Sequence, residues 1–180
     1  YRKSLFNRFL IRKVLRQADL VTYMAHHMRK YLVKMGIEEK KLLKVTLGIN
    51  TDIFNYIKEK SEPRDRIVII SNRTLEKEQN VSYFIRALPY LEENTTNVEV
   101  RIYGTGSYKN EIYGLVEELG VKSVINFMGV VPYEQMPDHL KKGDIYVSSS
   151  TSDGDHVSLM EAMACGLFPV VTDLPVNREW

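Results

Sequence analysis

The sequence predicts an α/β fold in which helices cover both faces of a parallel β-sheet, the doubly wound arrangement. From Ala18 onward, short apolar segments alternate with longer segments of helical periodicity. The strand candidates include continuous β-branched runs such as IVII at residues 67–70, which lack the alternation of a half-exposed strand. A sheet buried on both faces by crossover helices produces both features.

The expected elements begin with a helix at residues 2–17, where Leu5, Phe6, Phe9, Leu10 and Val14 recur on one side. The expected strands are residues 19–21, 42–46, 67–70, 98–103, 123–127, 144–148 and 169–172. The remaining helices are expected at residues 23–35, 80–92, 108–119, 133–141 and 157–164. Gly36 closes the first of these, as glycine often does after a helix.

Composition indicates a globular protein, since 44% of the 180 residues are hydrophobic and 27% are charged. No apolar run approaches the ~18 residues that a membrane span needs. The first apolar stretch is interrupted by Arg8, Arg12 and Lys13, which is not the pattern of a signal peptide. The single cysteine, Cys165, excludes an internal disulfide and suits a reducing compartment. We therefore expect a cytoplasmic location and a buried Cys165.

The charge distribution marks a domain junction. Residues 1–60 carry 14 basic and 5 acidic side chains, whereas residues 61–180 carry 11 basic and 18 acidic ones. The sign changes at Lys60-Ser61-Glu62-Pro63, where a polar stretch with a proline also interrupts the apolar pattern. We place one domain at residues 1–60 and another at residues 61–180.

The first helix fits two interpretations. Six basic and no acidic residues lie between Tyr1 and Ala18, a composition that suits peripheral contact with the anionic inner face of a membrane. The same helix could instead pack on its own domain and keep its basic face in solvent.

The loops after the strands are where a ligand is expected, because open parallel sheets bind ligands beyond the carboxyl ends of their strands. Four of these loops carry polar or glycine residues: SNR at 71–73, GTG at 104–106, GVV at 129–131 and SSSTSDG at 148–154. The joint occurrence of these loops indicates a binding site more strongly than any one of them.

Glu161 lies in the middle of the apolar segment VSLMEAMACGLFPVV. An ionised carboxylate there is costly without hydrogen bonds, so it marks either a functional site or an ion pair with a distant arginine. Gly154 and the free amides at the start of the helix at 157 form a site for an anion such as a diphosphate. Arg73 either reaches this anion from the neighbouring loop or forms a surface ion pair.

These segments resemble glycosyltransferase family 4, the retaining transferases with GT-B architecture and two Rossmann-like domains. The similar segments are residues 18–54, SNRTLE, IYGTGSY, FMGVVPYEQMPDHLKKGDIYVSSSTSDG and SDGDHVSLMEAMACGLFPVVTDLPVNREW. The last one has two acidic residues separated by seven others. The resemblance implies that residues 1–60 end the N-terminal, acceptor-side domain. Residues 61–180 would then be the nucleotide-sugar-binding Rossmann-like domain, truncated at its C-terminus.

The resemblance also implies roles for the site residues. Asp153 and Glu161 would be the catalytic pair, with Glu161 on the donor ribose and Asp153 beside the anomeric carbon of the transferred sugar. The donor-binding residues would be Arg73, Lys77, Gly104, Gly106, Gly129, Val130, Val131, Gly154, Val157, Ser158 and Leu159. Residues 129–131 would contact the base, and residues 154 and 157–159 would offer amides to the diphosphate. The family uses no metal and no cofactor, because helix amides and cationic side chains stabilise the leaving diphosphate.

Two departures from the family pattern concern the site. The first acidic position is more often glutamate, and Asp153 is one methylene shorter. A lysine often follows the arginine by about five residues, where this chain has Glu78 and Gln79, with Lys77 nearby. Most of an acceptor domain is absent, so we expect His26 and His27 to be packing or surface residues.

The function predicted from this resemblance is transfer of a hexose from a UDP- or GDP-sugar to a saccharide or lipid-linked acceptor in polysaccharide biosynthesis. No nucleic-acid partner is expected, and we expect the 180 residues alone to be inactive in transfer. One alternative is a GT-B-like UDP-sugar 2-epimerase, which would have further acid–base side chains in its cleft. Another is a non-catalytic module that only binds a nucleotide sugar.

Overall fold

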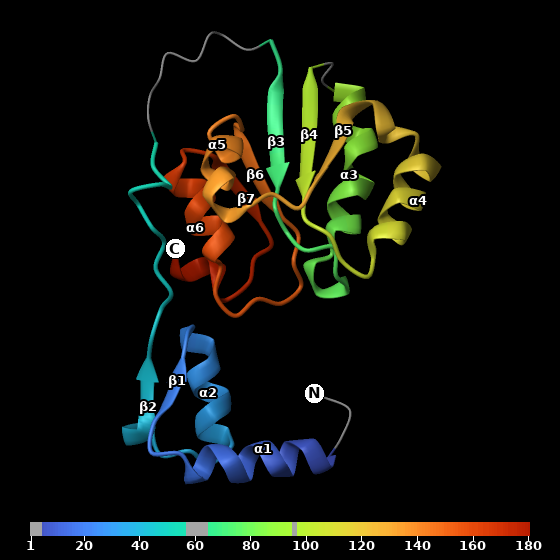
Figure 1. The fold of residues 1–180 in the computed structure, drawn as a ribbon. Coiled ribbons are helices and arrows are strands. Elements are labelled where there is room, and N and C mark those ends of the chain that lie inside the picture. The colour runs from blue at the N-terminus through green and yellow to red at the C-terminus, as the bar shows by residue number, and fades with distance from the viewer. Residues whose placement is uncertain (1–4, 57–64, 95–96) are drawn as a thin grey trace.

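The larger part of the molecule is a five-stranded parallel sheet with the strand order β5-β4-β3-β6-β7 (Figure 1). The computed structural model describes residues 5–56, 65–94 and 97–180. The strands of this sheet are β3 (Ile67–Ser71), β4 (Val98–Tyr103), β5 (Ile125–Gly129), β6 (Ile145–Ser148) and β7 (Phe168–Val171). This confirms the predicted doubly wound α/β fold.

Helices cover both faces of the sheet and enclose a separate core on each. The helices are α3 (Val81–Asn94), α4 (Lys109–Leu119), α5 (Met136–Leu140) and α6 (Val157–Ala164). α3 and α4 pack on the face that presents Val100 and Ile102, whereas α5 and α6 pack on the face of Ile70 and Tyr146. Cys165 is buried in the second core, as expected.

The strand order brings the loops after β3 and β6 together at the carboxyl edge of the sheet. The chain runs outward from β3 through β4 to β5 and then returns to the other side of β3 as β6. Because such crossovers are right-handed, this reversal moves the helices to the opposite face. The loops after β3 and β6 therefore diverge from neighbouring strands, which is the switch point where ligands bind in open α/β sheets.

A smaller N-terminal unit lies beyond the carboxyl ends of the large sheet (Figure 1). It contains α1 (Leu5–Gln17), β1 (Val21–Tyr23), α2 (His26–Lys34) and β2 (Leu42–Lys44), with β1 and β2 paired in parallel. The predicted junction at residues 60–63 lies outside the described residues, so the domain boundary stays a prediction.

α1 exposes an apolar strip formed by Phe9, Leu10 and Val14. The first residues of the helix predicted at 2–17 lie outside the described part of the chain. Within that part, no helix is long and apolar enough to cross a membrane. The arrangement of α1 is compatible with both interpretations of this helix, and membrane contact stays a prediction.

Several predicted element bounds are wrong, because pairing and turn geometry decide them rather than apolar content. The strand expected at 19–21 lies at Val21–Tyr23, in register with β2. Val121–Val124 forms a 3-10 turn, so β5 begins only at Ile125, opposite Val100 of β4. The helix expected at 133–141 is divided into a 3-10 turn at Tyr133–Gln135 and the short α5. Further 3-10 turns lie at Glu39–Lys41, Lys77–Gln79 and Asn177–Glu179.

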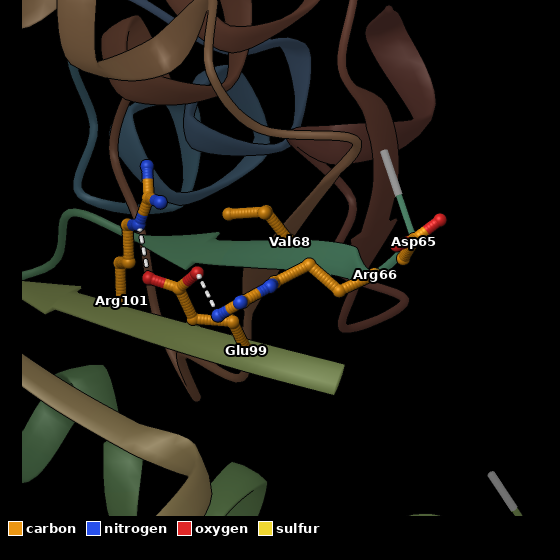
Figure 2. Close-up of a pocket in the computed structure, with 5 residues that line it drawn as sticks. All are labelled: Asp65, Arg66, Val68, Glu99 and Arg101. Atoms are coloured by element: carbon orange, nitrogen blue, oxygen red, sulfur yellow. Dashed lines mark hydrogen bonds and ion pairs between the residues drawn. The ribbon is translucent and has the colours of Figure 1, made fainter. Parts of the chain in front are cut away.

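A charged depression of about 380 Å³ lies at the amino ends of β3 and β4, away from the switch point (Figure 2). Glu99 is central to it, accepting hydrogen bonds from Arg101 Nε at 2.7 Å and Arg66 Nη1 at 3.4 Å. The hydrogen bond from Arg101 holds the pKa of Glu99 below its ordinary value, against the opposing effect of burial. Asn126 of β5 donates to the same carboxylate at 3.1 Å. Glu99 of β4 thus hydrogen-bonds to β5 and to the residue that precedes β3, and we interpret the depression as structural.

We expect Glu99→Gln to lower the free energy of unfolding by about 1–2 kcal/mol at pH 7. A lowered folded-state pKa contributes stability above the unfolded-state pKa, and this contribution is lost as the pH falls through the folded-state pKa. The difference between variant and wild type should therefore shrink below about pH 4.3. Urea denaturation at pH 7 and in acid measures both effects. Glu117→Gln, which removes an exposed pair with Lys122, is the control and should change stability by less than about 0.5 kcal/mol. An equal loss at both pH values would contradict the ionic role of Glu99.

Candidate functional site

Arg73 joins the two loops that diverge at the switch point. It follows β3, and its guanidinium donates to Gln79 Oε1 at 2.8 Å, to Ser158 Oγ at 3.1 Å and to the carboxylate of Asp153. The side chains of Arg73 and Asp153 are only 11% and 12% exposed. The ion pair is therefore an internal link between the β3 loop and the β6 loop, and not a surface pair.

The guanidinium keeps hydrogen-bonding capacity beyond these contacts. Arginine has five N–H groups, and the three described bonds use one from each nitrogen. One N–H group on each terminal nitrogen remains beyond these three bonds, and the Tyr146 hydroxyl is a further polar neighbour of the guanidinium. Arg73 can thus bind an anion such as a phosphate while its pair with Asp153 stays intact.

Asp153 is surrounded by three polar groups. One carboxylate oxygen accepts from Arg73 and lies 2.5 Å from Nε2 of His156, while the other accepts the Gly154 amide at 2.9 Å. Burial by itself raises the pKa of Asp153, but the contact with His156 and the charge of Arg73 outweigh it. The pKa is therefore lowered overall. Asp153 is consequently a stably ionised carboxylate.

His156 and Gln79 were not predicted as site residues. His156 is fully buried directly before α6, and Gln79 ends the 3-10 turn that follows the Arg73 loop. One feature of the sequence indicates Gln79: it lies where members of the resembling family often have a lysine. One feature indicates His156: its ring comes directly before the apolar segment of α6.

Glu161 lies on α6 and is only 6% exposed. Among the described residues it forms no ion pair, so the predicted alternative of a distant arginine partner finds no support there. Burial raises the pKa of Glu161, and a hydrogen bond with Tyr133 offsets this only in part. The fold thus keeps a poorly compensated carboxylate near the switch point, which is costly for stability.

The glycines of the β4 loop allow the Arg73 loop to pack closely. A Cβ on Gly106 would lie 2.3 Å from the Leu75 carbonyl oxygen, and Gly104 has a φ of 103°. Leu75 donates its amide to the Thr105 carbonyl at 3.0 Å. Gly129 ends β5, where its carbonyl accepts the Gly104 amide at 2.7 Å. The structure therefore brings Gly104, Gly106 and Gly129 together with the Arg73 loop through backbone packing.

The other predicted donor-binding residues lie in three places. Val157, Ser158 and Leu159 form the first turn of α6, beside Gly154 and the Arg73 guanidinium. Val130 is mostly exposed after β5, and Val131 packs on the second core. Lys77 lines a separate depression of about 160 Å³ with residues of α3 and α4, so the structure brings Gln79 rather than Lys77 to Arg73.

The N-terminal unit contacts the same loops. The amide of Leu47 donates to the Asp155 carboxylate at 2.9 Å. Glu179 accepts from the His26 amide and from Lys44 Nζ, each at 2.7 Å. A Cβ on Gly154 would meet Met28 Cε at 3.4 Å. The start of α2 therefore borders the site, with the His26 side chain exposed to solvent.

No group of three or more His, Cys, Asp or Glu side chains within residues 5–56, 65–94 and 97–180 is arranged to hold a metal ion. The absence of a metal from the site stays a prediction.

Comparison with known proteins identifies the fold and the family. Residues 52–180 match the family model described as "Glycosyl transferases group 1". A GDP-mannose-dependent alpha-(1-6)-phosphatidylinositol monomannoside mannosyltransferase of Mycolicibacterium smegmatis is 25% identical over 178 residues, covering 91% of this chain and 46% of that protein. The amylovoran biosynthesis glycosyltransferase AmsK of Erwinia amylovora is 26% identical over 162 residues, covering 87% and 39%.

A solved structure gives the same picture of the fold. The crystal structure of Anabaena HepE in complex with UDP and glucose matches with a TM-score of 0.83 at 16% identity, covering 99% of this chain and 51% of that chain. The chain spans less than half the length of the curated relatives described above.

We expect Glu161→Gln to stabilise the ligand-free protein at pH 7. A folded-state pKa raised above the unfolded one means that stability is greatest below the unfolded-state pKa and is lost as the pH rises. Removing the charge should add on the order of 1 kcal/mol and raise Tm by about 2–4 °C. Calorimetry at pH 7 measures this, with the exposed Glu118→Gln on α4 as a neutral control. A lower Tm for Glu161→Gln would reveal a stabilising partner for the carboxylate.

Proposed function

Because the chain belongs to the group 1 glycosyltransferases, we propose that it forms the nucleotide-sugar-binding side of a retaining hexosyltransferase. Its fold is that of the C-terminal domain of the GT-B architecture. The donor in this proposal is a UDP- or GDP-sugar, and the acceptor is a saccharide or a lipid-linked saccharide. The names of the relatives support this, since one is GDP-mannose-dependent and the Anabaena structure contains UDP and glucose.

The observation that carries the proposal is the partly unsatisfied guanidinium of Arg73 at the switch point. The guanidinium contacts Ser158 in the first turn of α6, and the free amides of that turn also favour an anion. A diphosphate placed there receives a charge-assisted hydrogen bond and the positive end of the helix dipole. These groups stabilise the negative charge of the leaving diphosphate as the bond to the sugar breaks.

The two carboxylates have separate tasks in this proposal. Glu161 accepts hydrogen bonds from the ribose hydroxyls, which replace the partners it lacks in the ligand-free protein. Asp153 stays ionised beside the transferred sugar, where its charge stabilises the positive charge that develops at the anomeric carbon. Residues 129–131 lie against the base. A 2-epimerase would need an additional acid–base group in reach of the sugar, and His156 is fully buried.

Binding and transfer assays test the proposal on the full-length protein. A panel of UDP-, GDP- and ADP-sugars should raise Tm for one base, since a ligand at ~100 times its Kd adds roughly 2.7 kcal/mol. Radiolabelled sugar from that donor should then appear in an acceptor. We propose that the 180 residues alone bind the donor without this transfer. Binding without transfer by the full-length protein would favour the non-catalytic alternative.

We expect Arg73→Ala to weaken binding of UDP or GDP far more than binding of uridine or guanosine. The lost charge-assisted hydrogen bond corresponds to ~1.5–3 kcal/mol, or about a 10- to 150-fold change in Kd. Isothermal titration calorimetry with the diphosphate and its nucleoside measures the difference. Arg86→Ala, an exposed site on α3, should leave both affinities unchanged. Equal losses for nucleoside and diphosphate in Arg73→Ala would make Arg73 a purely structural residue.

A further inference from the structure

His156 is a buried polar side chain that the proposed function does not use. It is fully buried, and its Nε2 lies 2.5 Å from the Asp153 carboxylate, although neither ring nitrogen has a hydrogen bond of normal geometry among the described residues. We propose that His156 is a positioning residue. Through Asp153, it fixes the orientation in which the Arg73 guanidinium faces a diphosphate. This inference rests on the proposed function.

Two of the three anchors of Arg73 are fixed by their own surroundings. Gln79 Oε1 also accepts a hydrogen bond from Ser150 Oγ at 2.8 Å. Ser150 Oγ in turn lies 3.1 Å from the Oγ of Ser148, at the end of β6. Ser158 belongs to the first turn of α6 and is held by the helix backbone. These two contacts bind Nε and one terminal nitrogen of the guanidinium.

The third anchor, Asp153, depends on His156. Asp153 lies in a loop, and apart from Arg73 its described contacts are the Gly154 amide and the His156 ring. The amide belongs to the adjacent residue and moves with the loop. The ring is enclosed at the start of α6 and is the contact that ties the carboxylate to a helix. Without the His156 ring, Asp153 can adopt other rotamers, and the second terminal nitrogen of Arg73, which is bonded to Asp153, shifts with the carboxylate.

Orientation matters here because a guanidinium binds phosphate through a planar, directional fork. Binding groups work when they are held within ~0.5 Å and 10–20° of the productive geometry. A His156 that only fills space would stabilise the protein without discriminating between a nucleoside and its diphosphate. A His156 that positions Arg73 must affect binding of the diphosphate selectively, and only while the Asp153 carboxylate is present for the ring to contact.

The first experiment compares His156→Leu and His156→Gln in the full-length protein, with UDP, uridine, GDP and guanosine as probes in calorimetry. His156→Leu removes the ring nitrogen that contacts Asp153 and should weaken binding of the favoured diphosphate about 5- to 20-fold, with nucleoside affinity within about 2-fold. His156→Gln retains an N–H donor and should recover most of this loss. The matched control is His139→Gln, which alters a histidine on α5 that contacts Tyr103 of β4. It should change neither affinity. If His156→Leu does not fold, His156→Met replaces it, since methionine adapts to irregular cavities.

The second experiment is a double-mutant cycle with Asp153→Ala, which removes both side-chain oxygens. If His156 acts through Asp153, the ratio of diphosphate to nucleoside affinity in Asp153→Ala should change by less than about 2-fold when His156→Leu is added. An undiminished effect in that background, or an equal loss for both probes, would overturn the positioning role. Failure of the wild type to bind UDP or GDP would instead overturn the proposed function, and the inference with it. Normal wild-type binding with an unaffected His156→Leu would overturn only the inference.

Discussion

The ion pair between Arg73 and Asp153 is the interaction on which the rest of the site depends. It joins the loops that leave β3 and β6, at the one place where the strand order reverses. Removing either partner of a buried pair leaves an uncompensated charge, which typically costs about 3–5 kcal/mol, so a change at either residue affects both loops. The glycine turn after β4 packs on the same loop, and thus every carboxyl-end loop of β3, β4 and β6 is placed relative to this pair.

The site contains two carboxylates whose pKa values are shifted in opposite directions. Asp153 has a guanidinium, a ring nitrogen and an amide around it, and its pKa is lowered. Glu161 has little more than the Tyr133 hydroxyl, and its pKa is raised by burial. One carboxylate is therefore preorganised by the protein, while the other lacks partners that a ligand can supply. Such a local cost is expected where binding rather than stability has shaped the residue.

Much of this arrangement could be predicted from the sequence, and the limits have physical causes. The alternation of apolar runs and helical segments determines the parallel sheet, and the polar loops of residues 71–73 and 148–154 follow from the strand ends. Which side chains meet across those loops depends on distances that no periodicity encodes. Gln79, and not the predicted Lys77, contacts Arg73, because a 3-10 turn at Lys77–Gln79 sets the direction of both side chains. His156 was missed because its meaning comes from its contact with Asp153.

In the proposed function, Arg73 binds a diphosphate while its ion pair with Asp153 stays formed. A crystal structure of the protein with UDP or GDP bound tests this most directly. We expect phosphate oxygens about 2.7–3.1 Å from the terminal nitrogens of Arg73, with the Arg73–Asp153 pair still formed. A diphosphate bound away from Arg73, or a guanidinium that has left Asp153 to reach it, would contradict this role of Arg73.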